Sequence, residues 1–110
     1  MTFKAGEIVL APFRFSDIDQ YKFRPVLVVS NASLLAETGH FLGAMITTAK
    51  NSTWTSDVPL VDHAADGLTV PCVVRYKLAT LDAGRVRKSL GQVGDEVLKV
   101  VRERIAATLT

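Results

Sequence analysis

Polar and basic side chains stand where several predicted strands begin or end, and their types suggest chemistry. Arg24 directly precedes the run PVLVVS, Thr47 and Thr48 close the run HFLGAMITT, and Arg75 and Lys77 follow CVV. Side chains at the ends of neighbouring strands in a small sheet can converge in one cleft. Guanidinium groups match phosphate oxygens in bidentate pairs, and a threonine hydroxyl adds another donor. The pattern predicts a phosphate-binding site formed by Arg24, Arg75 and Thr47.

Arg24 lies beside a residue that restricts it. Pro25 disfavours a helical conformation at the preceding residue, so Arg24 is expected to be extended at the start of a buried strand. Its guanidinium is then expected at the end of the sheet, facing the groups that lie there. From position alone, an arginine that caps the sheet edge or pairs with an acid fits equally well, and both interpretations stay open.

The elements that must position these residues are mostly short strands. The predicted strands are 6–15, bending at Pro12, 25–30, 40–50, 57–61 at a sheet edge, and 68–82 as one long strand or two. Residues 16–23 are predicted to be a polar loop, and 31–39 a loop with one helical turn that ends at Gly39. A helix is predicted from 95 to 109.

The predicted helix carries an apolar stripe at spacings of three, four and four residues. Its members are Leu98, Val101, Ile105 and Leu109. Five to seven strands followed by one helix favour a mainly β fold, a small and largely antiparallel barrel or curled sheet with the helix packed beside it. We expect one domain over residues 1–110.

Composition sets limits on the class of protein. The chain has 110 residues, of which 48% are apolar, and this is enough for one core without stabilising disulfides or metal ions. No apolar run approaches the roughly 20 residues that span a bilayer, and the acidic Glu7 comes too early for a secretory core. The net charge of +2 does not by itself indicate nucleic acid. We expect a soluble, unexported, cytoplasmic protein with no membrane partner, and the single cysteine, Cys72, agrees with a reducing compartment.

Strong local motifs for nucleotides or metals are absent from the sequence. There is no GxGxxG, GxxxxGK, HExxH or paired CxxC. His63 in DHAAD is interpreted as a residue of a surface turn, His40 as an ordinary histidine, and Cys72 as a buried inert thiol. The cluster RVRK at 85–88 is interpreted as a solvated turn. We expect neither a metal site nor a cofactor.

Seven segments, taken in order, resemble one known family. They are GEIVLAPF, RPVLVVSN, AMITTAK, DVPL, GLTVPCVVR, LATLD and LGQVGDEVLKVVRERI. Nearly the whole chain is similar to the MazF/PemK toxins of type II toxin–antitoxin systems. The resemblance implies an SH3-like barrel with a terminal helix, a homodimer, and metal-independent cleavage of single-stranded RNA at short sequences. It also implies a cognate antitoxin that covers the RNA groove with an acidic segment, and contact with operator DNA only through an antitoxin complex.

The resemblance assigns residues one by one. Arg24 matches the arginine of the family's RP-x-LV motif, Thr47 matches its strand-end threonine, and Arg75 matches a further arginine that some members use in catalysis. The chain departs from those members in two places. Lys77 stands where they carry an acid, and the loop 16–23 lacks the histidine that some of them have.

The implied reaction is attack of a ribose 2′-hydroxyl on the adjacent phosphate. It requires positive charge, a proton acceptor and a proton donor. Arg24 and Arg75 would supply the charge, because an arginine is a poor base. Thr47 would hold a phosphate oxygen.

The remaining roles are divided among several candidates. For the base the candidates are Asp17 and Asp19, in a loop expected to close one wall of the RNA groove, and Lys77 would act as an acid or bind phosphate. Thr48 and Trp54 complete the expected substrate-binding set, with Trp54 stacking on unpaired bases.

Two other functions remain open. The first is a non-catalytic member of the same fold that binds nucleic acid or an antitoxin, which Lys77 and the missing loop histidine favour. The second is an SH3-like interaction module unrelated to toxins. Aromatic residues make up 7% of the chain, and this low share counts against a peptide-binding surface.

Overall fold

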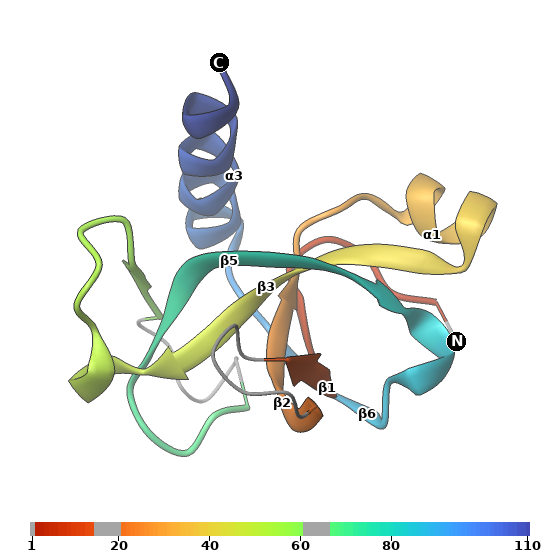
Figure 1. Ribbon diagram of the computed structural model, residues 1–110, viewed down its shortest axis with the longest axis horizontal. Coiled ribbons are helices and arrows are strands. Elements are labelled where there is room, and N and C mark those ends of the chain that lie inside the picture. Colours follow the sequence, from red (N-terminus) through yellow and green to blue (C-terminus); the bar gives the residue numbers. More distant parts are fainter. Residues whose placement is uncertain (1, 15–20, 61–66) are drawn as a thin grey trace.

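Within residues 2–14, 21–60 and 67–110, which this computed structural model describes, six strands form one antiparallel sheet in the order β4-β5-β3-β2-β1-β6. The elements are β1 (Glu7–Arg14), β2 (Tyr21–Val28), α1 (Ala32–Thr38), β3 (His40–Thr48), η1 (Ala49–Asn51), β4 (Val58–Pro59), β5 (Cys72–Asp82), η2 (Ala83–Arg85), β6 (Lys88–Gln92) and α3 (Asp95–Leu109). The sheet curls into a half-barrel, and α3 rises from one side and carries the C terminus away (Figure 1). The predicted mainly β, SH3-like fold with a C-terminal helix is confirmed.

The second strand begins earlier than the sequence suggested. β2 starts at Tyr21, so the predicted loop 16–23 is wrong for residues 21–23, and Arg24 lies within the strand opposite Ala11. Pro25 is tolerated there because β3 pairs with β2 only from Val26 onward. Among the described strands, Pro25 is therefore paired with β1 alone. Its missing N–H leaves no hydrogen bond of the ladder unmade.

Pro12 is accommodated in the same way. It lies opposite Phe23 of β2, while β6 pairs with β1 only over Glu7–Leu10. The predicted exclusion of Pro12 from a fully paired position is confirmed. Among the described strands, β1 and β2 therefore continue beyond Leu10 and before Val26 as a two-stranded ribbon.

The strand β5 carries an irregularity that bears on the site. Its pairs with β3 shift register between Ala44, opposite Leu78, and Ile46, opposite Val74. Residues 75–77 of β5 thus face a single residue of β3. Bulges of this kind re-aim side chains, and here the affected segment contains Arg75 and Lys77.

β4 and β6 complete the sheet at its two edges. Of the predicted strand 57–61, whose last residue lies outside the described residues, Val58–Pro59 form β4, which lies at a sheet edge, as expected. β6 is an additional strand that the sequence pattern did not predict, because KSLGQ contains no β-branched or aromatic residue. It forms through pairing with β1, a tertiary contact.

The single helical turn expected in residues 31–39 is a longer helix, α1. The side chain of Asn31 accepts a hydrogen bond from the Leu34 N–H at 3.2 Å and caps its start. Gly39 ends it with φ 74°, a left-handed conformation that favours glycine. Leu35 anchors the helix in the core.

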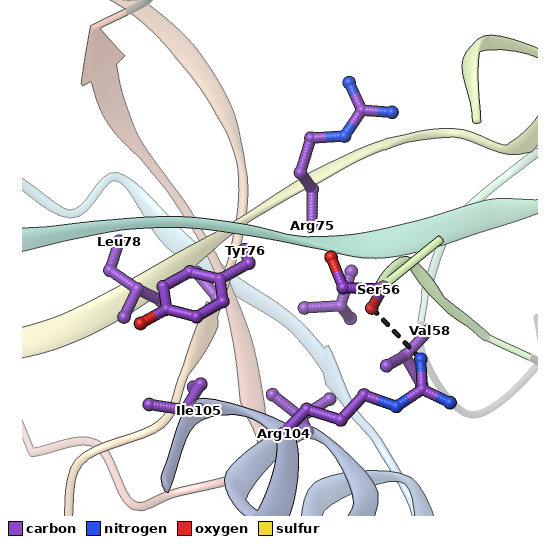
Figure 2. A pocket seen from close by; sticks show the side chains of 10 residues that line it. Ser56, Val58, Arg75, Tyr76, Leu78, Arg104 and Ile105 are labelled. Atoms are coloured by element: carbon purple, nitrogen blue, oxygen red, sulfur yellow. Dashed lines mark hydrogen bonds between the residues drawn. The ribbon is translucent and has the colours of Figure 1, made fainter. Parts of the chain in front are cut away.

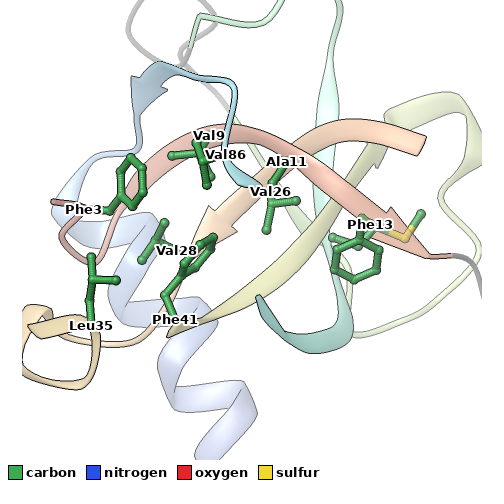
Figure 3. Close-up of a cluster of buried hydrophobic side chains, with 10 residues drawn as sticks. Phe3, Val9, Ala11, Phe13, Val26, Val28, Leu35, Phe41 and Val86 are labelled. Carbon is green, nitrogen blue, oxygen red and sulfur yellow. The ribbon is translucent and has the colours of Figure 1, made fainter. Parts of the chain in front are cut away.

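Two clusters of buried side chains hold the elements together. The first lies between β1, β2 and β3 and under α1, and includes Phe3, Val9, Val26, Val28 and Phe41 (Figure 3). The second lies on the other side of the sheet, where α3 covers it.

Helix α3 uses only part of its predicted apolar stripe. Val101 is buried and Ile105 packs against the second cluster, whereas Leu109 is 73% exposed. The prediction that Leu109 belongs to the packed stripe of the helix is wrong for this chain, because α3 extends past the sheet and leaves Leu109 exposed. No described helix is long and apolar enough to cross a membrane.

Candidate functional site

Arg24, Thr47 and Thr48 line one open hollow of ≈ 220 Å³. The other lining residues are Pro25, Ile46, Asn51, Leu68, Thr69, Val70 and Cys72. The hollow lies beside the start of the β2–β3 pairing, where continuing the register Val26↔Met45 by two residues sets position 24 opposite position 47. The structure thus brings Arg24 together with the strand-end residues Thr47 and Thr48.

The side chains in the hollow differ in their hydrogen bonding. Thr48 Oγ1 accepts a hydrogen bond from Asn51 Nδ2 at 2.8 Å. The hydroxyl of Thr47 makes no hydrogen bond to another described residue, so it is available to a ligand. Arg24 is half-buried with its Nε atom shielded from solvent, which gives its charge a less polar environment than bulk water.

Arg75 does not line this hollow. Its Nε donates to Asp57 Oδ1 at 3.1 Å and its Nη2 donates to Asp57 Oδ2 at 2.9 Å, a bidentate ion pair. The side chains of Arg75 and Asp57 are only 11% and 2% exposed. Of the three groups predicted to meet, Arg24 and Thr47 share a hollow and Arg75 lies outside it.

Arg75 nevertheless reaches a residue of the hollow. Its Nη2 also donates to the main-chain carbonyl of Asn51 at 3.0 Å, and Asn51 is one of the lining residues. The ion pair and the hollow are thus adjacent parts of one surface, joined at the end of η1.

The ion pair has a clear electrostatic signature. The hydrogen bond from Arg75 holds the pKa of Asp57 below its ordinary value of 3.8, against the opposing effect of burial. A hydrogen bond from Ser52 Oγ to Asp57 Oδ2, at 2.9 Å, acts in the same direction. The pKa of Arg75 is raised by its bond to Asp57, so both groups are charged at neutral pH.

Trp54 lies against these cations rather than in the core. It is 40% exposed, with the Arg75 Cζ 4.9 Å and the Lys77 Nζ 5.9 Å from its ring centroid. Cations over an indole face are attracted by its quadrupole. The arrangement combines positive charge with a partly open aromatic ring.

Helix α3 is hydrogen-bonded to the backbone of the segment that carries Asp57. Arg104 Nη1 donates to the carbonyl oxygens of Ser56 at 3.1 Å and Asp57 at 3.3 Å, whereas Arg75 extends from β5 away from α3 (Figure 2). A small apolar pocket between α3 and β5, lined by Tyr76 and Ile105 among others, separates the two arginines. The backbone that carries Asp57 is therefore tied to the C-terminal helix.

Sequence reasoning missed Asp57, Ser52, Asn51 and Arg104. The sequence signal for Asp57 is a carboxylate directly before the edge strand β4, at a strand end like those that carry the arginines. Asp17 and Asp19, the candidate bases, lie outside the described residues, as does His63. Among the described residues no group of three or more His, Cys, Asp or Glu side chains is placed to hold a metal ion.

A model of the PemK-like, MazF-like toxins of type II toxin–antitoxin systems matches residues 4–109. The chain belongs to this family. The match covers almost the whole chain, including the hollow, the ion pair and α3. A sequence comparison with curated proteins gave no significant match.

Solved structures of MazF toxins share the fold. MazF from Deinococcus radiodurans superimposes with a TM-score of 0.80 at 24% identity, covering 99% of this chain and 97% of that one. A MazE–MazF structure from the same organism has a TM-score of 0.76 at 24% identity, with 99% and 96% covered. A mycobacterial endoribonuclease in complex with its cognate antitoxin has a TM-score of 0.75 at 22% identity, with 97% and 94% covered.

Proposed function

We propose that this MazF/PemK-family toxin is an endoribonuclease that cleaves single-stranded RNA without a metal ion and so inhibits growth. The observation that carries the proposal is the shared hollow of Arg24, Thr47 and Thr48, which is open to solvent and has the donors that a phosphate needs. Family membership supplies the reaction, and the placement of these residues supports it.

The reaction proceeds by attack of a ribose 2′-oxygen on the adjacent phosphorus. The bond from phosphorus to the 5′-oxygen of the next nucleotide breaks, leaving a 2′,3′-cyclic phosphate and a 5′-hydroxyl. Arg24 stabilises the extra negative charge of the phosphorane, and the Thr47 hydroxyl donates to one of its oxygens. Arg75, adjacent to the hollow and paired with Asp57, adds a guanidinium donor for the phosphate.

The proton transfers fall to other side chains. The 2′-hydroxyl proton is accepted by Asp17 or Asp19, which lie in the sequence between β1 and β2 and outside the described residues. Lys77 either protonates the departing 5′-oxygen or binds phosphate, while Thr48 contacts the substrate backbone. Trp54 stacks on an unpaired base, since its exposed ring and adjacent cations suit single-stranded nucleic acid.

The proposed partners follow from the family. Solved relatives include a MazE–MazF structure and an endoribonuclease with its cognate antitoxin, so we propose an antitoxin that occludes the hollow. We also propose a homodimer, contact with operator DNA only through an antitoxin complex, and action in the cytoplasm, where mRNA is translated.

A second candidate function is favoured by one observation. The bidentate bond to Asp57 occupies much of Arg75, and Lys77 replaces an acid of catalytic relatives. A non-catalytic barrel that binds nucleic acid or an antitoxin agrees with that arrangement.

One assay separates these functions. Purified protein is incubated with mixed-sequence single-stranded RNA in excess EDTA, beside Arg24→Ala and the control Arg85→Ala, whose exposed arginine lies outside the hollow. We expect cleavage by the wild type, a loss of about 10²-fold or more in Arg24→Ala, and wild-type activity in Arg85→Ala. RNA binding without cleavage by the wild type would favour the non-catalytic barrel.

A further inference from the structure

We propose that Asp57 is a positioning residue that holds the Arg75 guanidinium in a fixed orientation and leaves its Nη1 edge for the RNA phosphate. The inference rests on the proposed function, since it assigns a role within that reaction. It explains why an arginine matched to a catalytic position is nevertheless bonded to a carboxylate.

The guanidinium is constrained on two edges and one face. Of its five N–H groups, the Nε–H and one on Nη2 go to the two oxygens of Asp57, and the other on Nη2 goes to the Asn51 carbonyl. The Trp54 ring lies against its face, 4.9 Å from Cζ. The two N–H groups on Nη1 have no acceptor among the described residues, so they are the donors left for a ligand.

Asp57 is itself held firmly enough to act as a reference point. Its carboxylate accepts from Ser52 Oγ at 2.9 Å, its own N–H donates to the Trp54 carbonyl at 3.1 Å, and its carbonyl accepts from Arg104 Nη1 at 3.3 Å. Its side chain is 2% exposed. The orientation of Arg75 is thus set by the buried Asp57, which is itself held by the more exposed Ser52 and Trp54 and by Arg104 of α3.

The fixed orientation of the Arg75 guanidinium is expected to raise the rate of RNA cleavage. A free arginine side chain samples many rotamers, and ordering it in the transition state costs entropy. A guanidinium already fixed by Asp57 avoids that cost, and a misplaced group of this kind can lower a rate by about 10²-fold. A purely structural ion pair would instead affect stability and leave the chemical step unchanged.

The test is a double-mutant cycle on RNA cleavage. kcat and KM are measured for wild type, Asp57→Asn, Arg75→Ala and the double variant, with thermal unfolding of each. We expect Asp57→Asn to lower kcat by about 10²-fold with KM changed much less, and to cause no further loss in the Arg75→Ala background. Ser52→Ala, which keeps the ion pair but loosens the carboxylate, should lower kcat by a smaller factor, and Asp57→Glu should recover part of the loss.

The outcomes separate the two proposals. An inactive wild type refutes the proposed function, and the positioning role with it. An active wild type with unchanged kcat in Asp57→Asn, or an equal loss in both backgrounds, overturns the positioning role alone. If Asp57→Asn does not fold, Ser52→Ala is measured in both backgrounds, and its full activity overturns the role.

Discussion

Arg75 donates a hydrogen bond to the main-chain carbonyl of Asn51, and the side chain of Asn51 donates another to Thr48 Oγ1. One residue of η1 therefore joins the arginine of β5 to the threonine at the end of β3. The hollow and the ion pair are therefore adjacent and connected through this short helix. Changes on either side of Asn51 are expected to be felt on the other.

Thr47 provides the simplest test of the hollow. Thr47→Val keeps the shape of the side chain but removes the hydroxyl, and we expect the rate of RNA cleavage to fall by up to about 10²-fold. Thr47→Ser keeps the hydroxyl and should retain most of the activity. Equal rates in the two variants would show that the hydroxyl does not act on the phosphate.

Trp54 reports on RNA directly, because it is the only tryptophan in the chain. Its fluorescence should change when a non-cleavable single-stranded RNA binds, and Trp54→Ala should weaken binding by about 1 to 3 kcal/mol. Trp54→Phe, which keeps an aromatic face, should bind more tightly than Trp54→Ala. Unchanged fluorescence on saturation with RNA would place the bases elsewhere.

The Asp57–Arg75 pair should make stability depend on pH in a defined direction. Arg75 holds the pKa of Asp57 below 3.8, so the stabilisation is present above about pH 4 and is lost as the pH falls through the lowered pKa. Asp57→Asn should reduce the free energy of unfolding at pH 7 by about 3 kcal/mol, because it leaves Arg75 partly buried without its anion. Urea unfolding of both proteins at pH 7 and pH 3 measures this.

The difference between the two proteins should shrink at pH 3. Asp95→Asn is the control, since Asp95 is exposed in the first turn of α3. A difference that stays constant from pH 7 to pH 3 would contradict the ion-pair explanation.

Gly43 permits the close approach of β2 and β3. A Cβ at this position would meet Cγ1 of the buried Val26 and would lie 3.2 Å from Cδ1 of Leu81, which packs against the core. We expect Gly43→Ala to destabilise the protein by about 1 to 3 kcal/mol in urea unfolding. Gly94→Ser is the control, because Gly94 has open space around its Cα and serine suits a helix N-cap.

The broad architecture could be predicted from the sequence, because the spacing of apolar residues and the positions of prolines are local properties. Strand segments, the terminal helix and the edge position of Pro59 all followed from them, and the family resemblance added the barrel. The strand β6 did not follow, since its residues have weak β propensity and its partner β1 is far away in the sequence. The start of β2 was misplaced because the tolerance for Pro25 depends on where β3 stops pairing.

The candidate site was predictable in part for the same reason. Arg24 and Thr47 meet because residues beside a shared register lie close, and strand ends can be read from the sequence. The binding of Arg75 to Asp57 depends on a register shift in β5 and on a two-residue edge strand. Neither has a local sequence pattern, so the ion pair required the three-dimensional structure.

The prolines of the β1–β2 ribbon also protect the protein against aggregation. The segment FRPVLVV is strongly β-prone, and an open border beside it would be a template for strands of other molecules. Pro12 and Pro25 sit just where the neighbours β6 and β3 stop pairing, and each withholds the N–H that an incoming strand would need to extend the ladder. Replacing them would therefore threaten solubility before it threatened the fold.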